Sequence, residues 1–389
     1  MTAARIPPRA ARITAARFDV LNSRAAELGA EGHAVISLGQ ALPGFGPPPA
    51  AIEALRQGLA QPDTHIYSAD AGRRSLREAL CDRIRADGAR IVPEEVIITA
   101  GGNQAFMLAL MTLVDPGDEV LLPAPYFVNH EMAMSAFGAS PREVPLSETH
   151  GFVLRWRDLE PDVSSRTRAV VVCSPSNPTG AVVPPEELAR VVRELAARGV
   201  VLFVDETYAR FVYEGPRSSA AALPEWRDTC VVIGTFSKSF GMTGWRVGYM
   251  LASQEVCDQA IKIHDAMIIC APVPSQVAVE AAVRESWDYP ERFMGELMER
   301  RALLADGLKE IPRLRWTPTG GGFFAFVHVE GCTDSAGLAA DILERVHVVT
   351  VPGSTFGRSG EGFIRVSYAA VSRDDLRTAL TRLRLFFNG

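Results

Sequence analysis

Between about residues 50 and 275, short apolar runs rich in β-branched residues alternate with longer segments of helical period. Parallel strands are buried on both faces and need long crossover connections, so this alternation is typical of a mostly parallel sheet covered by helices. In the segment 185–197 (PEELARVVRELAA), for example, four apolar residues fall on one helical face. The sequence therefore predicts an α/β core with strands at EVIIT (95–99), EVLLP (119–123), AVVVC (169–173), VVLFV (200–204), CVVIG (230–234) and RVGYML (246–251).

The pattern changes after Pro272. We expect long helices over about 276–310, then strands, then a closing helix from Ser372. The expected strands of this region are GFFAFVHV (322–329), HVVTV (347–351) and GFIRVSYA (362–369).

A chain of 389 residues that is 47% hydrophobic is long enough for two domains. We predict a large α/β domain at 46–275 and a small α+β domain at 276–389. Residues 1–45 are expected to form an N-terminal arm and part of the small domain, and the Arg-rich start of this arm is expected to pack on a neighbouring subunit.

Composition limits the kinds of partner. The formal net charge is −6 and no block of Lys or Arg forms a basic stripe, which argues against nucleic acid. The chain contains no run of eighteen apolar residues, so we expect no membrane partner. The six cysteines show no C-x-x-C spacing and are interpreted as reduced thiols of a cytoplasmic enzyme. Small molecules are the expected ligands.

Polar residues follow the strand ends of the α/β core, where open parallel sheets bind ligands. After the first strand, AGGNQA (100–105) leads into a helix, and its two glycines would let backbone N–H groups approach an anion. It could equally be a helix start without a ligand. After another strand, SPSNPTG (174–180) is either a plain turn or a frame that holds the amide of Asn177 toward a ligand.

Asp205 and Tyr208 follow a third strand in the sequence DETY. An Asp at this point can cap a helix, or it can be an ionised carboxylate that keeps a heterocyclic nitrogen protonated. Tyr208 lies three residues further on, so both side chains could face one ligand.

The loop TFSKSFGMTGWRVGYM (235–250) contains one of only three lysines, the others being Lys262 and Lys309. An amine can lose its proton and attack a carbonyl, which a guanidinium cannot do. Lys238 could be an ordinary solvated cation, yet it follows a buried strand. Thr235 and Ser237 beside it suit a phosphate, and Arg246 suits bidentate phosphate recognition.

Taken together, these residues describe one ligand with a phosphate, an aromatic nitrogen, a phenolic oxygen and an aldehyde. Pyridoxal 5′-phosphate (PLP) has all four groups. The ordered motifs AGGNQ, PYF, SPSNPTG, VDETY and TFSK…GWRVGY are far more specific than any single one.

By these motifs the chain resembles the class I and II aminotransferases, which are PLP enzymes of fold type I, from about Ser37 to its C-terminus. The resemblance implies an α/β fold of a fold type I PLP-dependent transferase. Its large domain would have a mostly parallel sheet of seven-stranded type sandwiched by helices, and its small domain would be α+β.

The resemblance also implies roles for the catalytic and ring-binding residues. Lys238 would bind the cofactor's aldehyde covalently, and Asp205 would pair with the pyridine nitrogen. Tyr208 and Asn177 would hold the ring oxygen, and Tyr126 in PAPYF would stack on the ring face. The phosphate would be held in or near the segments of Gly101, Gly102, Asn103, Thr235, Ser237 and Arg246.

Further implied roles concern the substrate and a partner subunit. Tyr67 in HIYSADAG would reach the cofactor phosphate of a second subunit, so the resemblance implies a homodimer with shared active sites. Arg365 would bind the substrate α-carboxylate, near Asn177 and Tyr126, and Gly39 lies in the loop that closes over it. Strand alternation independently places Arg365 on the same face as Phe363, although a surface arginine on an edge strand would show the same pattern.

The expected activity is ping-pong amino-group transfer between an L-amino acid and a 2-oxo acid. Asp70 in YSADAG would favour a neutral or basic side chain, such as that of ornithine or a guanidino amino acid, or it could cap a local turn. The cofactor motifs leave open a PLP-dependent lyase, a replacement enzyme or a cyclising enzyme. A non-catalytic sensor linked to a DNA reader is a further alternative, but no residues are left over for such a reader.

Other chemistries lack their motifs. NHEMAMS (129–135) begins like H-E-x-x-H but has Met134 in place of the second histidine, so we expect no metal site. No G-x-G-x-x-G follows the first strand and no Walker A loop occurs, which argues against hydride transfer and nucleotide hydrolysis.

Overall fold

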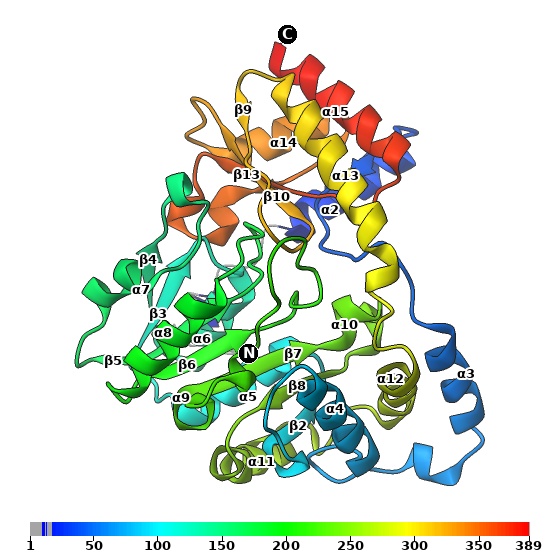
Figure 1. Cartoon of the computed structure of the whole chain (residues 1–389). Helices are drawn as coiled ribbons and strands as arrows, with labels where there is room; N and C mark the ends of the chain where they lie inside the picture. Colours follow the sequence, from blue (N-terminus) through cyan, green and yellow to red (C-terminus); the bar gives the residue numbers. More distant parts are fainter. Residues whose placement is uncertain (1–9, 12, 14–17, 389) are drawn as a thin grey trace, which may run out of the picture.

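The structure is a computed structural model that describes residues 10, 11, 13 and 18–388. Its central element is a seven-stranded sheet in which only β8 runs antiparallel to its neighbours (Figure 1). The expected α/β core is therefore confirmed. The strand order is β2 (Val96–Thr99), β8 (Gly248–Leu251), β7 (Cys230–Thr235), β6 (Val201–Asp205), β5 (Thr167–Cys173), β3 (Glu119–Ala124) and β4 (Ser140–Pro145).

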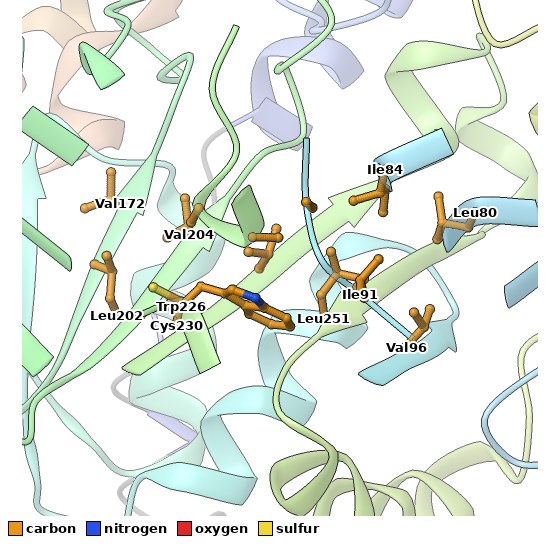
Figure 2. Packing of buried hydrophobic residues seen from close by; sticks show 14 of the residues in the cluster. Leu80, Ile84, Ile91, Val96, Val172, Leu202, Val204, Trp226, Cys230 and Leu251 are labelled. Atoms are coloured by element: carbon orange, nitrogen blue, oxygen red, sulfur yellow. The ribbon is translucent and has the colours of Figure 1, made fainter. Parts of the chain in front are cut away.

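Side-chain alternation along the strands divides the core into two layers, because successive residues of a strand point to opposite faces. On one face Val170, Val172, Leu202 and Val204 pack with three helices, α4 (Arg74–Ala86), α8 (Pro185–Ala196) and α12 (Val273–Glu285). Figure 2 shows part of this layer, in which the ring of Trp226 lies between Leu202 of β6 and Leu251 of β8. The opposite face packs against α5 (Gly102–Leu113), α6 (Val128–Phe137) and α11 (Gln254–Ile268).

Strand β4 is the element that the apolar pattern did not reveal. Its sequence SPREVP contains two prolines, and only Val144 is buried. Proline lacks the N–H that a ladder needs, so it is tolerated at a sheet edge, and β4 pairs only with β3.

A second sheet lies above the first in the view of Figure 1, together with the C-terminal helices and α2 (Phe18–Ala30). Its antiparallel strands are β12 (Val351–Pro352), β13 (Phe363–Ser367), β10 (Phe324–Val329) and β9 (Leu314–Arg315). The segment expected as one strand at 347–351 is divided, since β11 (Val348–Val349) pairs in parallel with β1 (Ile36–Ser37).

The expected long helices at 276–310 are also two elements, α12 and α13 (Glu291–Lys309), separated by a turn that ends at Pro290. The helices that follow are α14 (Ser335–Val346) and α15 (Arg373–Asn388). The shorter helices and turns are α3 (Pro49–Gly58), η1 (Pro62–His65), η2 (Pro93–Glu95), η3 (Glu148–His150), α7 (Trp156–Leu159), η4 (Glu160–Asp162), η5 (Ala220–Ala222), α9 (Trp226–Thr229), α10 (Phe236–Ser239), η6 (Thr243–Trp245), η7 (Gly353–Phe356) and η8 (Arg358–Gly360).

The domain boundaries at 45 and 275 stay predictions. Most of the Arg-rich start, expected to pack on a neighbouring subunit, lies outside the described residues. Of the helices that the structure describes, none combines the length and the apolarity that a bilayer span requires.

Candidate active site

A cavity of about 400 Å³ lies where the strand ends of the large sheet meet the segments 39–42 and 349–351. Eleven of the residues selected from the sequence line it, although they come from widely separated parts of the chain. They are Gly39, Gly102, Asn103, Asn177, Asp205, Tyr208, Thr235, Ser237, Lys238, Arg246 and Arg365. Gly101, Tyr126 and Tyr67 are not among the residues that line it.

Lys238 lies in the single-turn helix α10, which begins directly after strand β7. Thr235 caps this turn, because its Oγ1 accepts a hydrogen bond of 3.1 Å from the backbone N–H of Ser237. The Lys238 Nζ donates to the carbonyl of Ala41 at 2.8 Å. Burial and the positive charges of Arg365 and Arg246 lower the pKa of Lys238 to about 8. The amine is therefore much easier to deprotonate than that of an exposed lysine.

Asp205, at the end of β6, is buried and bonded on both oxygens. Its Oδ1 accepts from the backbone N–H of Thr207 at 2.9 Å, and its Oδ2 lies 3.1 Å from Nε2 of His130. Burial alone would raise the pKa of Asp205, but the hydrogen bond and charge of His130 and the bonds from Thr207 outweigh it and lower the pKa. The carboxylate is thus held ionised inside the protein.

His130 is a site residue that the sequence analysis missed. It was considered only within the metal-like motif NHEMAMS, whereas it lies on α6 with its ring against Phe106 and lines the cavity. The available signal was its place just after the end of β3, next to the other strand ends that carry polar residues. In the described part of the chain, no group of three or more His, Cys, Asp or Glu side chains is placed to hold a metal ion.

The start of α5 forms an anion cradle with Arg246. Gly101 has φ +86°, and a Cβ at this position would lie 2.3 Å from Nη2 of Arg246. Arg246 is itself in the left-handed region and donates to the carbonyls of Thr243 at 2.8 Å and of Ala100 at 3.4 Å. Gly101 therefore leaves room for the guanidinium beside the N–H groups of the helix start, although it does not line the cavity itself.

The expectation that Tyr126 stacks on the cofactor ring is not supported. Its side chain turns away from the cavity, and its hydroxyl donates to Oε1 of Glu143 at 3.0 Å. The next residue, Phe127, lines the cavity instead. Adjacent residues of a loop can face opposite directions, and the motif PAPYF does not by itself reveal which aromatic ring faces inward.

Arg365 is held rigidly at the opposite end of the cavity. It is 2% exposed, its Nη1 donates to Oδ1 of Asn177 at 2.8 Å, and its Nη2 donates to the carbonyl of Gly39. Its guanidinium carbon lies 5.1 Å from the ring centre of Phe324 and 5.0 Å from that of Phe356. Strand β13 pairs on both sides, so the alternative of a surface arginine on an edge strand is wrong.

Burial lowers the pKa of Arg365 to about 10, and burial also raises the pKa of the Tyr208 phenol. At neutral pH the cavity therefore presents a charged guanidinium and a protonated phenol at this end.

Tyr67 lies outside the cavity, with 73% of its surface exposed. Its loop is fastened by the buried Gln276, whose Nε2 donates to Ser68 Oγ at 3.2 Å and whose Oε1 accepts from the Arg73 N–H at 2.8 Å. Asp70, in the same loop, is not one of the residues that line the cavity either.

A buried amine, an ionised carboxylate, an anion cradle and a fixed guanidinium at the strand ends of this sheet define a PLP enzyme of fold type I. The residues fit the cofactor, since the cradle suits its phosphate, Asp205 suits its ring nitrogen and Lys238 suits its aldehyde. The family model "Aminotransferase class I and II" matches residues 33–383. The chain belongs to the class I and II aminotransferases, which use PLP.

Relatives and solved structures agree with this assignment. The aspartate aminotransferase of Pyrococcus horikoshii is 34% identical over 91% of this chain and 91% of that protein. Aromatic-amino-acid aminotransferase 2 of Thermococcus litoralis is 33% identical over 90% of each chain. The structure of aspartate aminotransferase from Thermus thermophilus with maleate matches with a TM-score of 0.93 at 31% identity, covering 98% of this chain and 99% of that one.

Proposed function

We propose that this aminotransferase moves the amino group of an L-amino acid with a neutral side chain to a 2-oxo acid, by a ping-pong mechanism. The observation that carries the proposal is the charge of the cavity lining. Among the described residues that line it, the lysine and arginine side chains are Lys238, Arg246 and Arg365, and each would have a role at the amino group, the phosphate or the α-carboxylate, while His130 is engaged with Asp205.

PLP supplies an aldehyde that takes up the amino group and a protonated ring that withdraws electrons from the reacting carbon. Asp205, kept ionised by His130 and Thr207, holds the proton on the ring nitrogen. The Nζ of Lys238, with its lowered pKa, is the base that moves the substrate α-proton. Arg365 binds the α-carboxylate through its planar fork and thereby orients the α-carbon toward Lys238.

The remaining residues hold the cofactor in place. Tyr208 and Asn177 line the cavity between Asp205 and Arg365 and are suited to the ring oxygen. Gly102, Asn103 and the hydroxyls of Thr235 and Ser237 surround the place where the phosphate would lie. Phe127 is the aromatic residue suited to the ring face.

The substrate side chain would meet Leu21, Leu42, Val349 and Val351, which line the cavity near Gly39. An apolar lining favours aliphatic, thioether or aromatic side chains over charged ones, because an unpaired buried charge is costly. The earlier hypothesis of a basic side chain depended on Asp70, which does not line the cavity. Nor does this lining offer a further cation for a side-chain carboxylate, although relatives of this chain are named for aspartate.

Absorbance changes of the PLP-loaded enzyme test this proposal, with single amino acids as donors. We expect phenylalanine, methionine or leucine to convert the cofactor fully and release the matching 2-oxo acid, with aspartate and ornithine far slower. A preference for aspartate or ornithine would overturn the neutral class. Regeneration of PLP with release of a side-chain fragment would instead indicate a lyase.

We further propose a homodimer in which Tyr67 reaches the cofactor phosphate of the partner. Supporting this, the loop that carries Tyr67 is fastened yet projects Ile66 and Tyr67 into solvent, with 65% and 73% of their surfaces exposed. Ile52 and Leu59 on and after α3 are exposed apolar residues of the preceding segment. A second copy of the chain would cover this surface and complete both sites.

Hybrid dimers test the crossing. A hybrid of Lys238→Ala and Tyr67→Ala subunits should regain one site with wild-type PLP affinity, since the defects fall in the same site. A hybrid of Lys238→Ala and Arg365→Ala is the control, because Lys238 and Arg365 line one cavity of one chain, and it should regain no site with wild-type affinity for the amino acid. If the first hybrid regains no site either, Tyr67 acts within its own subunit.

A further inference from the structure

We propose that Glu143 is a positioning residue that ties the loop 353–360 to the end of strand β3 and thereby holds Arg365 in place for the substrate carboxylate. The inference rests on the proposed role of Arg365. It assigns a function to Tyr126 as well, whose side chain points away from the cavity.

The tie consists of hydrogen bonds from two separate segments to one carboxylate. Glu143 lies on the edge strand β4, opposite Leu122 of β3. Its Oε1 accepts from the hydroxyl of Tyr126 at 3.0 Å, and both of its oxygens lie 3.2 Å from the backbone N–H of Arg358. Glu143 therefore joins the large sheet to the loop that precedes β13.

The backbone of the same loop is bonded directly to Tyr126. The N–H of Tyr126 donates to the carbonyl of Phe356 at 3.1 Å. Gly357 between these contacts has φ +101°, and a Cβ there would lie 2.8 Å from Cε1 of Tyr126 and 3.2 Å from Oε1 of Glu143. The two segments are thus in close contact, and only glycine leaves room for it.

Phe356, in this loop, packs against Arg365, so the position of the loop affects the position of the guanidinium. This ring is fully buried and its centre lies 5.0 Å from the guanidinium carbon of Arg365. On the other side, Tyr126 precedes Phe127, which lines the cavity. Glu143 therefore links the ring that packs on Arg365 with the segment that lines the cofactor end.

The hydroxyl of Tyr126 remains a hydrogen-bond donor to Glu143 at neutral pH. Burial and then the neighbouring Glu143 charge raise the pKa of Tyr126, so its hydroxyl stays protonated and donates. Hydrogen bonds to a charged acceptor are about twice as strong as neutral ones. Loss of the carboxylate would remove the bonds from Tyr126 and Arg358 together and leave only the backbone bond between Tyr126 and Phe356.

Glu143→Ala in the PLP-loaded enzyme tests the inference. We expect KM to rise about tenfold for the amino donor and the 2-oxo acid alike, with kcat changed by less than about twofold. PLP affinity should stay as in the wild type, and amide hydrogen exchange in the segment 353–360 should accelerate. The matched control is Glu131→Ala, because Glu131 lines the same surface hollow but bonds to Ser135 of its own helix, and it should change none of these quantities.

Two further variants keep the outcome decisive. Tyr126→Phe retains the ring against Gly357 and removes one bond, so it should raise KM about threefold even if Glu143→Ala fails to fold. Arg365→Ala tests the underlying assignment, and an unchanged KM there would reject the role of Arg365 itself. If Arg365→Ala raises KM while Tyr126→Phe and a folded Glu143→Ala do not, or if exchange accelerates without a change in KM, the positioning role of Glu143 is wrong.

Discussion

The two ends of the active-site cavity are built in different ways. The cofactor end is formed by side chains and helix starts at the ends of neighbouring strands of one sheet: Asp205 is the last residue of β6, and Lys238 lies in the helical turn that follows β7. The substrate end combines segment 39–42 with 349–351 and with Arg365, which are brought together by the pairing of β1 with β11 and of β12 with β13. One end follows from local sequence and the other from long-range pairing.

This difference has a functional consequence. Residues at the strand ends of a rigid sheet are placed within narrow limits, which suits a cofactor that must be held the same way for every substrate. At the substrate end Arg365 depends on Asn177 and on the carbonyl of Gly39, which come from other segments. We expect changes at the cofactor end to abolish chemistry, and changes at the substrate end to alter binding and selectivity.

The largest effect should come from Lys238. Lys238→Ala and Lys238→Arg should both abolish transamination, since neither side chain offers an amine that can bind the aldehyde and move a proton. The absorbance that shows covalent attachment of PLP should disappear as well. Lys262→Arg and Lys309→Arg are matched controls on exposed helix surfaces and should remain active. A fully active Lys238→Arg enzyme would refute the assignment of the cofactor end.

Asp205→Asn should have the next largest effect. Asparagine keeps the shape and a hydrogen bond, but it lacks the charge that holds the ring nitrogen protonated, so kcat should fall by about 10²- to 10³-fold. PLP binding, measured by absorbance titration, should be weakened far less than kcat. Only a mild loss of rate would mean that Asp205 serves mainly as a cap for the turn at Thr207.

Arg365→Ala should act at the substrate end and spare the chemistry. Loss of the guanidinium should weaken the binding of all amino acids alike, by ~2 to 5 kcal/mol, as expected when a desolvated charge pair loses one partner. The measurement is kcat/KM for a series of neutral donors. Uniform loss would sharpen the contrast between the two ends, whereas loss confined to one side-chain type would mean that Arg365 contacts the side chain.

The sequence predicted that most residues of the cofactor end lie close together, and it did so for a physical reason. Each of its motifs follows an apolar run, and in a parallel sheet the carboxyl ends of such runs meet at one edge, so local patterns implied proximity. The apolar runs also predicted six of the seven strands. Strand β4 was missed because an edge strand tolerates prolines and polar residues and so lacks the apolar signal.

Prediction from the sequence failed where the site depends on which of two adjacent side chains faces the cavity, or on contacts between segments that are distant in sequence. Tyr126 and Phe127 are neighbours in one aromatic motif, and their orientation depends on Glu143 and on the loop 353–360, far away in sequence. His130 was overlooked because its partner, Asp205, is 75 residues distant. Leu42 and Val349 line the cavity without any motif, so the side-chain preference could not be deduced from the sequence.

The smallest expected effect concerns His130, whose Nε2 is hydrogen-bonded to Oδ2 of Asp205. Because the hydrogen bond and charge of His130 lower the pKa of Asp205, His130→Asn should raise that pKa. Asp205 is effective only when ionised, that is, at pH above its pKa. As the solution is acidified, the variant should therefore lose activity at a higher pH than the wild type does. At pH values well above this acid limb of the kcat profile, kcat should change little. His150→Asn is the control, since His150 is exposed and its ring Nδ1 lies 3.5 Å from Oγ1 of the neighbouring Thr149, away from the cavity lining. If the acid limb of kcat does not move, His130 contributes packing alone, and the charge of Asp205 is maintained by the bonds from Thr207.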